Sequence, residues 1–187
     1  MNPALLYARS RHVPASALAV LAGTALLWAF TRDGGGSAAD PRTGAFVLAL
    51  GAMAASVGFG GQDHALDRTA AIRWWPRRAA HVLAAATVLA AAVTAAQALG
   101  DAGTALALTA RNSFGLTGLA AIGAVLTGGT YAWTLPFGWL LLAFVAPPAM
   151  TVTTWMLTPA GTPSSTWTAA VLIVAGTVSY ALRGPGR

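Results

Sequence analysis

The chain has 187 residues, of which 56% are hydrophobic and only 9% are charged. Soluble globular domains carry about 25% charged residues, so this composition excludes a soluble domain and indicates an integral membrane protein. The net charge of +6 comes from eleven arginines and five aspartates. The arginines lie at the edges of apolar segments, which argues against a nucleic-acid-binding face. The chain has no cysteine, which excludes disulfides and thiolate metal sites.

Six stretches have the length and apolar character of membrane spans, since a transmembrane helix needs about 20 apolar residues. They cover residues 13–30, 43–60, 79–99, 113–129, 136–157 and 166–182. Arg9 and Arg11 precede the first stretch, as basic residues do in a signal peptide. No cleavage signal leads into a soluble domain, so we interpret this stretch as a retained first span.

The charged stretch Gln62–Arg78, "QDHALDRTAAIRWWPRR", lies between the second and third spans. It predicts a short surface helix over residues 63–73, with Asp63 as a plausible N-cap. His64 lies beside Asp63 and three residues before Asp67. Asp63, His64 and Asp67 could together bind a metal ion. A solvated helix face is the simpler interpretation, so no metal site is predicted.

The fourth stretch has two interpretations. Thr104–Ala110 is apolar, Arg111-Asn112-Ser113 interrupts it, and Phe114–Gly129 completes a span. Either a tilted helix begins near Thr104 and carries Arg111 below the outer interface, or Thr104–Asn112 lies along the membrane surface. The sequence leaves both open.

Pro147 and Pro148 lie near the middle of the fifth stretch. Each proline removes a backbone donor and obstructs the preceding turn, so this helix is expected to kink or break. The freed carbonyls then need protein neighbours or a water-filled path. Together with Gln97, Arg111 and Asn112, the two prolines are candidates for a substrate path or gate. Helix–helix hydrogen bonds are the alternative role for Gln97 and Asn112, and the favoured one.

Counting arginines gives the orientation. With the N-terminus in the cytoplasm, eight arginines lie on inner segments and three, Arg32, Arg42 and Arg111, on outer ones. This distribution fits the positive-inside rule. The predicted fold is therefore an all-α bundle of six transmembrane helices in a bacterial plasma membrane, with both termini in the cytoplasm.

Several kinds of chemistry lack their residues. The chain has no lysine for a Walker A loop, no HExxH, no aspartate-rich pair within a span and no nucleophile elbow. Ionisable groups deep in a span mark functional pathways, and Arg111 is the single candidate. An enzyme and an ion-coupled transporter are therefore both disfavoured, and no catalytic or cofactor residue is predicted.

Three segments, "LDRTAA", "ARNSFGLTGLA" and "TVSYALRGPGR", resemble small permeases encoded beside a separate ATPase in high-GC bacteria. With the charged helix between spans two and three, the chain resembles the six-span membrane subunit of ATP-binding-cassette exporters of the ABCG-like type. The resemblance implies that residues 63–73 form a coupling helix in a cleft of an ATPase dimer. Its contact residues would be Asp63, His64, Leu66, Asp67, Arg68, Ile72 and Arg73.

The resemblance also implies the cofactors and partners. ATP and Mg²⁺ would bind to the ATPase and not to this chain, and a second permease chain, identical or different, would complete the path. The exported substrate would be a small molecule or peptide. One departure is that ABCG-like permeases have re-entrant helices between spans five and six, whereas only Thr158–Ser165 is available here. The alternative function is an accessory or immunity protein that binds a partner without transporting anything.

Overall fold

The structure is a computed structural model that describes residues 41–60, 74–99 and 106–186. These residues form five α-helices and three short 3-10 helices, with no strand among them. The helices are α3 (Pro41–Ser56), α5 (Trp74–Leu99), α6 (Leu106–Thr127), α7 (Thr134–Val145) and α8 (Pro163–Arg183), and the 3-10 helices are η1 (Val57–Phe59), η2 (Gly129–Tyr131) and η3 (Trp155–Leu157). The predicted first span and the predicted coupling helix over residues 63–73 lie outside the described residues.

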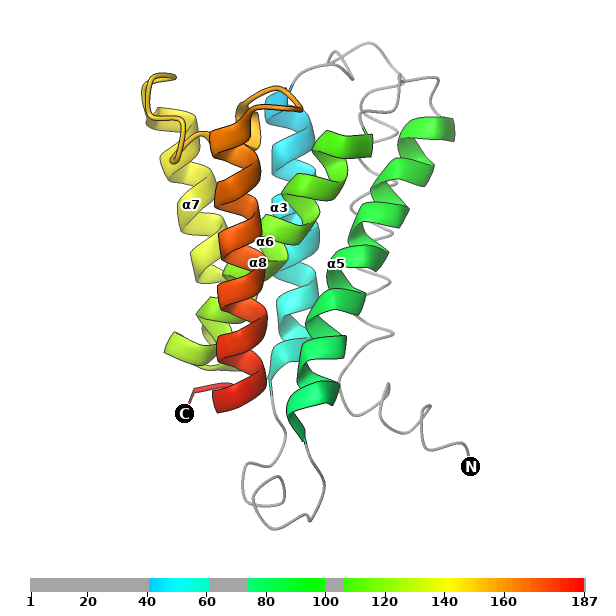
Figure 1. Ribbon diagram of the computed structural model, residues 1–187, viewed down its shortest axis with the longest axis vertical. Coiled ribbons are helices and arrows are strands. Elements are labelled where there is room, and N and C mark those ends of the chain that lie inside the picture. Colours follow the sequence, from blue (N-terminus) through cyan, green and yellow to red (C-terminus); the bar gives the residue numbers. More distant parts are fainter. Residues whose placement is uncertain (1–40, 61–73, 100–105, 187) are drawn as a thin grey trace.

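Successive helices alternate in direction and form an up-and-down bundle (Figure 1). The tilted helix α6 crosses this bundle and contacts each of the other four α-helices. In the described part of the chain, three stretches are long and apolar enough to cross a membrane: Pro41–Phe59, Trp74–Ala98 and Pro163–Arg183. These three helices fit a membrane protein. Gly129–Val145 is apolar but shorter, and α6 has 22 residues but carries Arg111.

Four described helices carry a proline in their first turn: Pro41 in α3, Pro76 in α5, Pro136 in α7 and Pro163 in α8. Helix α5 starts at Trp74, five residues before the predicted span, so that Pro76 lies in its first turn. Proline is tolerated there because the N–H groups of the first turn have no intrahelical acceptor. Pro163 occupies the same part of α8, which is the position where its fixed backbone angle suits a helix start.

Helices α6 and α8 approach each other through glycine. A Cβ atom on Gly118 of α6 would collide with the Leu172 carbonyl of α8, and one on Gly176 would collide with the Gly118 carbonyl. In lipid, helices gain little by hiding apolar surface, and small residues allow the backbones to pack closely. The two glycines therefore allow α6 and α8 to cross with their backbones in close contact.

The lower end of the bundle, as drawn in Figure 1, is held by a buried tyrosine. Tyr180 of α8 is 1% exposed, and its hydroxyl donates a 2.9 Å hydrogen bond to the Phe59 carbonyl at the end of η1. The two rings also lie with their centroids 5.3 Å apart. This contact ties the last turn of α8 to the end of α3 and η1.

The predicted fifth stretch, residues 136–157, is not one helix. Helix α7 ends at Val145, and Ala146 is extended, the conformation that a residue before proline prefers. The chain then folds back along α7. There the indole N–H of Trp139 donates to the Thr153 carbonyl at 3.0 Å. The connection between α7 and α8 therefore covers residues 146–162. It is longer than the Thr158–Ser165 loop expected from the sequence, because the prolines end the helix instead of bending it.

Candidate functional site

The upper end of the bundle carries an arginine inside a continuous helix. Helix α6 runs unbroken from Leu106 to Thr127, so Arg111 lies in its second turn. The helix is tilted across the bundle (Figure 1). The sequence left two interpretations of this stretch open, a continuous helix from near Thr104 or a surface segment followed by a span. The structure has the continuous helix, and Arg111 lies within it.

The Arg111 guanidinium binds backbone carbonyls of the α7–α8 connection. Nη2 donates to the Trp155 carbonyl at 2.9 Å and to the Thr158 carbonyl at 2.8 Å. Nη1 donates to the Pro159 carbonyl at 3.0 Å, and Nε donates to Asn112 Oδ1 at 3.2 Å. We call Arg111, Asn112 and the segment Trp155–Pro159 the arginine clamp.

Asn112 completes the arginine clamp. Its side chain is 1% exposed, and its Nδ2 donates to the Met156 carbonyl at 2.8 Å. Trp155 and Met156 are fully buried. Backbone can be buried only where its polar groups find partners. Arg111 and Asn112 together donate to four carbonyls of this segment, those of Trp155, Met156, Thr158 and Pro159.

The partial negative charge of carbonyl oxygens explains why an arginine suits this position. Three carbonyl oxygens, those of Trp155, Thr158 and Pro159, accept from the guanidinium. The described residues contain no aspartate or glutamate, so within them the carbonyl dipoles are what stabilise the guanidinium. Thr158 Oγ1 donates to the Trp155 carbonyl as well, at 2.8 Å.

Glycine shapes the socket for Trp155. A Cβ atom on Gly115 would collide with the Trp155 ring and would lie 3.1 Å from the Cβ of Ala169. Gly115 is one turn from Arg111 on α6, so this helix provides both the space for the indole ring and the donors for the backbone around it. The arginine clamp is thus built by one face of α6.

Helices α5 and α6 carry further buried polar side chains. Thr109 Oγ1 donates to Gln97 Oε1 at 3.2 Å. The hydroxyls of Thr94, Ser113 and Thr117 are buried and have no hydrogen-bond partner among the described residues, and Ser113 and Thr117 are completely buried. A buried hydroxyl without a partner costs about 1–3 kcal/mol. Such groups call for an explanation, and a polar ligand or water is one.

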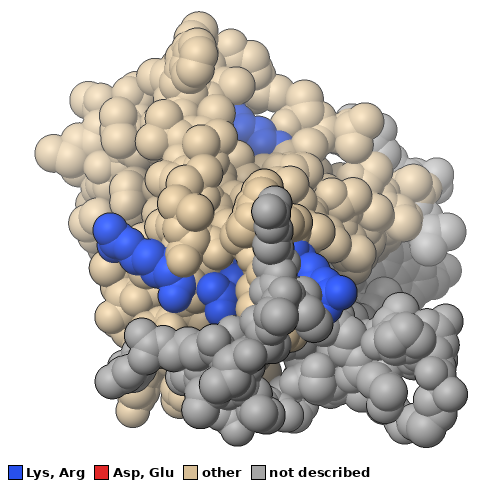
Figure 2. Space-filling model, turned by 60° about the horizontal axis from the view of Figure 1, so that its bottom comes forward, with Lys and Arg blue, Asp and Glu red and all other residues tan. Residues whose placement is uncertain are grey.

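The lower end of the bundle is basic. Arg77 and Arg78 lie in the first turn of α5 and Arg183 ends α8, and these helix ends meet at the lower end (Figure 1). Figure 2 shows basic side chains across the face that comes forward when this end is turned toward the viewer. Arg77 also lies 5.6 Å from the ring centre of Trp74, a cation–π distance.

No protein-family model, no curated protein and no solved structure matches the chain. The site must therefore be interpreted from its own residues. Of the predicted path residues, Gln97, Arg111 and Asn112 lie at the upper end of the bundle, whereas Pro147 and Pro148 are exposed residues of the α7–α8 connection.

The predicted ATPase-contact residues, Asp63, His64, Leu66, Asp67, Arg68, Ile72 and Arg73, lie outside the described residues. The structure adds participants that the sequence did not indicate. Three of the four acceptors for Arg111 are backbone carbonyls, and Trp139 and Gly115 contact the segment that carries them. Two features of the sequence pointed to this region: an arginine, Arg111, in an apolar stretch, and the double proline Pro147–Pro148 further along the chain.

Proposed function

We propose that the chain is the membrane-embedded permease subunit of an ATP-binding-cassette exporter, with six spans and a separate ATPase. The observation that carries the proposal is the arginine clamp, in which α6 holds the short 3-10 helix η3 and the irregular residues after it against the upper end of the bundle. In lipid, such backbone is tolerated where protein buries it or where it lines a water-filled path, as in the broken helices of transporters.

The long α7–α8 connection also supports this proposal. ABCG-like permeases have re-entrant elements between their last two spans, and residues 146–162 supply a connection that folds back along α7 and buries Trp155. Residues 146–162 occupy the corresponding place in the chain. In this proposal the connection is the outer gate, and the arginine clamp holds it closed.

The charge distribution supports a cytoplasmic lower end. Of the five described arginines, Arg77, Arg78 and Arg183 lie at helix ends that meet there, whereas Arg42 and Arg111 lie near the upper starts of α3 and α6. A basic excess is typical of the cytoplasmic side. Helix α3 ends and α5 begins at this lower end (Figure 1), so the proposed coupling helix over residues 63–73 connects helices that face the ATPase.

Transport would then proceed as follows. Closure of the ATPase dimer moves the coupling helix, and the motion passes through α3 and α5 to α6, which packs against all four other described α-helices. A shift of α6 relative to the α7–α8 connection breaks the hydrogen bonds of the arginine clamp. The unpartnered hydroxyls of Ser113 and Thr117 would face the solute path, and a second permease chain would form its other half.

Co-purification with ATPase measurement tests this proposal. The chain should be extracted from its native membrane with an ATPase bound. Replacing Asp67 and Arg68 together by alanine should abolish the coupling of ATP hydrolysis to export while membrane insertion stays normal. The matched control is Arg42→Ala, which removes a charge from the upper end and should leave the coupling intact. If no ATPase accompanies the chain, the proposal fails and the accessory or immunity protein becomes the better interpretation.

A further inference from the structure

Facing sides of α5 and α6 carry a line of polar side chains. The hydrogen bond from Thr109 Oγ1 to Gln97 Oε1 shows that these two sides meet. Side chains three or four residues apart lie on the same side of a helix. Thr94 is therefore one turn below Gln97 on α5, as drawn in Figure 1. Ser113 and then Thr117 follow below Thr109 on α6 at steps of four residues. We call Gln97, Thr94, Thr109, Ser113 and Thr117 the polar row.

Three hydroxyls of the polar row are available for hydrogen bonding. Those of Thr94, Ser113 and Thr117 are buried and have no partner among the described residues. A helical serine or threonine can donate to the carbonyl four residues before it, and Thr87 and Thr127 do so, each at 2.9 Å. The three hydroxyls of the polar row do not make this bond. Their hydrogen-bonding capacity therefore remains available to another molecule.

The polar row contains no charged side chain. Arg111 is close in sequence, but a step of two residues turns an α-helix by about 200°, so Arg111 lies on the opposite side of α6 from Ser113. There its guanidinium donates to carbonyls of the α7–α8 connection. An ion that leaves water for a site with only hydroxyl and amide dipoles loses much of its solvation. The polar row therefore favours an uncharged molecule, and hydroxyls suit one that both donates and accepts hydrogen bonds.

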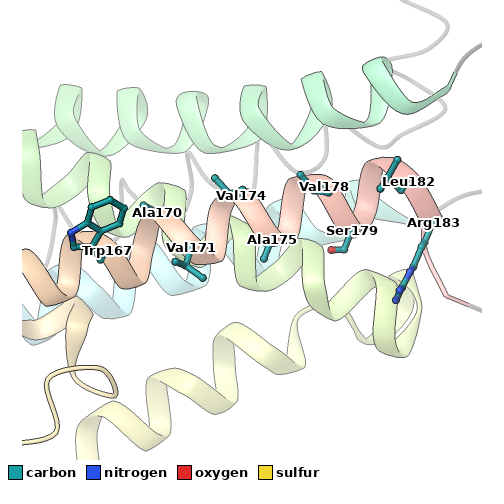
Figure 3. A pocket seen from close by; sticks show the side chains of 9 residues that line it. All are labelled: Trp167, Ala170, Val171, Val174, Ala175, Val178, Ser179, Leu182 and Arg183. Atoms are coloured by element: carbon teal, nitrogen blue, oxygen red, sulfur yellow. The ribbon is translucent and has the colours of Figure 1, made fainter.

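The polar row leads from the upper end into the bundle. The rise along α6 from Thr109 to Thr117 is about 12 Å at 1.5 Å per residue. The outward face of α8 has a different lining, since its groove of about 580 Å³ is almost entirely apolar (Figure 3). The hydroxyl in that groove, on Ser179, already donates to the Gly176 carbonyl at 3.2 Å. Of these two surfaces, the polar row is the one that suits a polar solute.

We propose that the polar row is the path of a small, uncharged solute that forms hydrogen bonds, such as a polyol or an amide. This inference rests on the proposed transport function and adds the class of solute to it. In the structure α5 and α6 are closed over the polar row, because Ser113 and Thr117 are completely buried. The solute enters when these helices separate, and its polar groups then supply the partners that the three hydroxyls lack.

Cysteine modification tests the path, because the chain has no native cysteine. Iodoacetamide is an uncharged amide, and iodoacetate is an anion of similar size. In vesicles that contain the full chain, iodoacetamide should modify Ser113→Cys at least about tenfold faster than Leu119→Cys, since opening at the polar row is local. Leu119 is the matched control, because it is 3% exposed and belongs to the apolar core. If the two rates are equal, the polar row is not a path.

The charge of the reagent tests the class of solute. Both rates at Ser113→Cys are divided by the rates at the exposed position Ala160→Cys. The relative rate with iodoacetate should be about 50-fold lower than with iodoacetamide, the factor for a charge at membrane depth. Equal relative rates would overturn the assignment of an uncharged solute. Neither measurement needs an ATPase, so a failure here is distinguishable from a failure of the permease proposal, which co-purification tests.

Thr117 provides two further variants. Thr117→Cys should show the same preference for iodoacetamide, which keeps the test valid if Ser113→Cys does not fold. Thr117→Val replaces the hydroxyl by a methyl group of similar size. Because that hydroxyl has no partner in the closed bundle, the unfolding midpoint should stay the same or rise. A lower midpoint would show that the hydroxyl is bonded within the closed bundle, and the polar row would then be a structural network instead of a path.

Discussion

Replacing Arg111 by methionine tests whether the arginine clamp holds the α7–α8 connection in place. Methionine replaces the unbranched apolar part of the side chain but removes all four donated hydrogen bonds. The bond to Pro159 is exposed to solvent, where water replaces it, so the main loss comes from the partly buried bonds to Trp155 and Thr158. Hydrogen bonds from charged groups contribute about 1.5–3 kcal/mol each, and the expected loss of local stability is about 3 kcal/mol.

Cysteine labelling measures this loss directly, because the chain contains no native cysteine. The side chain of Met156 is fully buried, and its carbonyl accepts from Asn112. A Met156→Cys reporter is therefore labelled by a membrane-impermeant maleimide only when the connection opens. A loss of about 3 kcal/mol raises the open population, and hence the labelling rate, about 100-fold.

Two controls make the labelling result specific. In an Ala86→Cys reporter, which lies at a fully buried position of α5, Arg111→Met should leave the labelling slow, since the opening is local. Arg42→Met should not accelerate the labelling of Met156→Cys. If Met156→Cys is labelled at the same rate with and without Arg111, then Arg111 does not hold the connection closed, and the gate mechanism must be abandoned.

Two further predictions concern the packing of the bundle. Gly118→Val should destabilise the protein by at least about 2 kcal/mol in a denaturant titration, because its side chain would collide with the Leu172 carbonyl; Gly138→Val, at a position with no atom within 4 Å, is the control and should cost much less. Tyr180→Phe should cost about 1–2 kcal/mol in the same titration by removing the hydrogen bond to the Phe59 carbonyl, and an unchanged unfolding midpoint would show that this bond does not stabilise the end of α8.

The positions of α3 and α8 could be predicted from the sequence because each is a long apolar stretch between polar residues. Helices α3 and α8 begin within three residues of the predicted stretches 43–60 and 166–182. Helix α5 begins at Trp74, five residues before the predicted span 79–99. Charged residues indicate where a helix meets the lipid headgroups, but the helix itself extends beyond that point, as α5 does through Arg77 and Arg78.

The arginine clamp could not be predicted because its acceptors have no sequence signature. Every residue carries a backbone carbonyl, and the acceptors for Arg111 lie 44 to 48 residues further along the chain. Arg111-Asn112-Ser113 therefore suggested an interruption of the span. Pro147 and Pro148 predicted that the helix would kink or break, but the path taken afterwards depends on how Trp155 fits against Gly115, a contact that only the folded bundle creates.

The late synthesis of the Arg111 partners has a consequence for biogenesis. When α6 leaves the ribosome and enters the translocon, Trp155, Thr158 and Pro159 have not yet emerged, so the guanidinium enters the membrane without its acceptors. Insertion scales assign about 2.5–3.5 kcal/mol to an arginine at the centre of a helix and less near its end. In the proposed topology α6 therefore carries this cost until α7 and the α7–α8 connection have been synthesised and the hydrogen bonds of the arginine clamp can form.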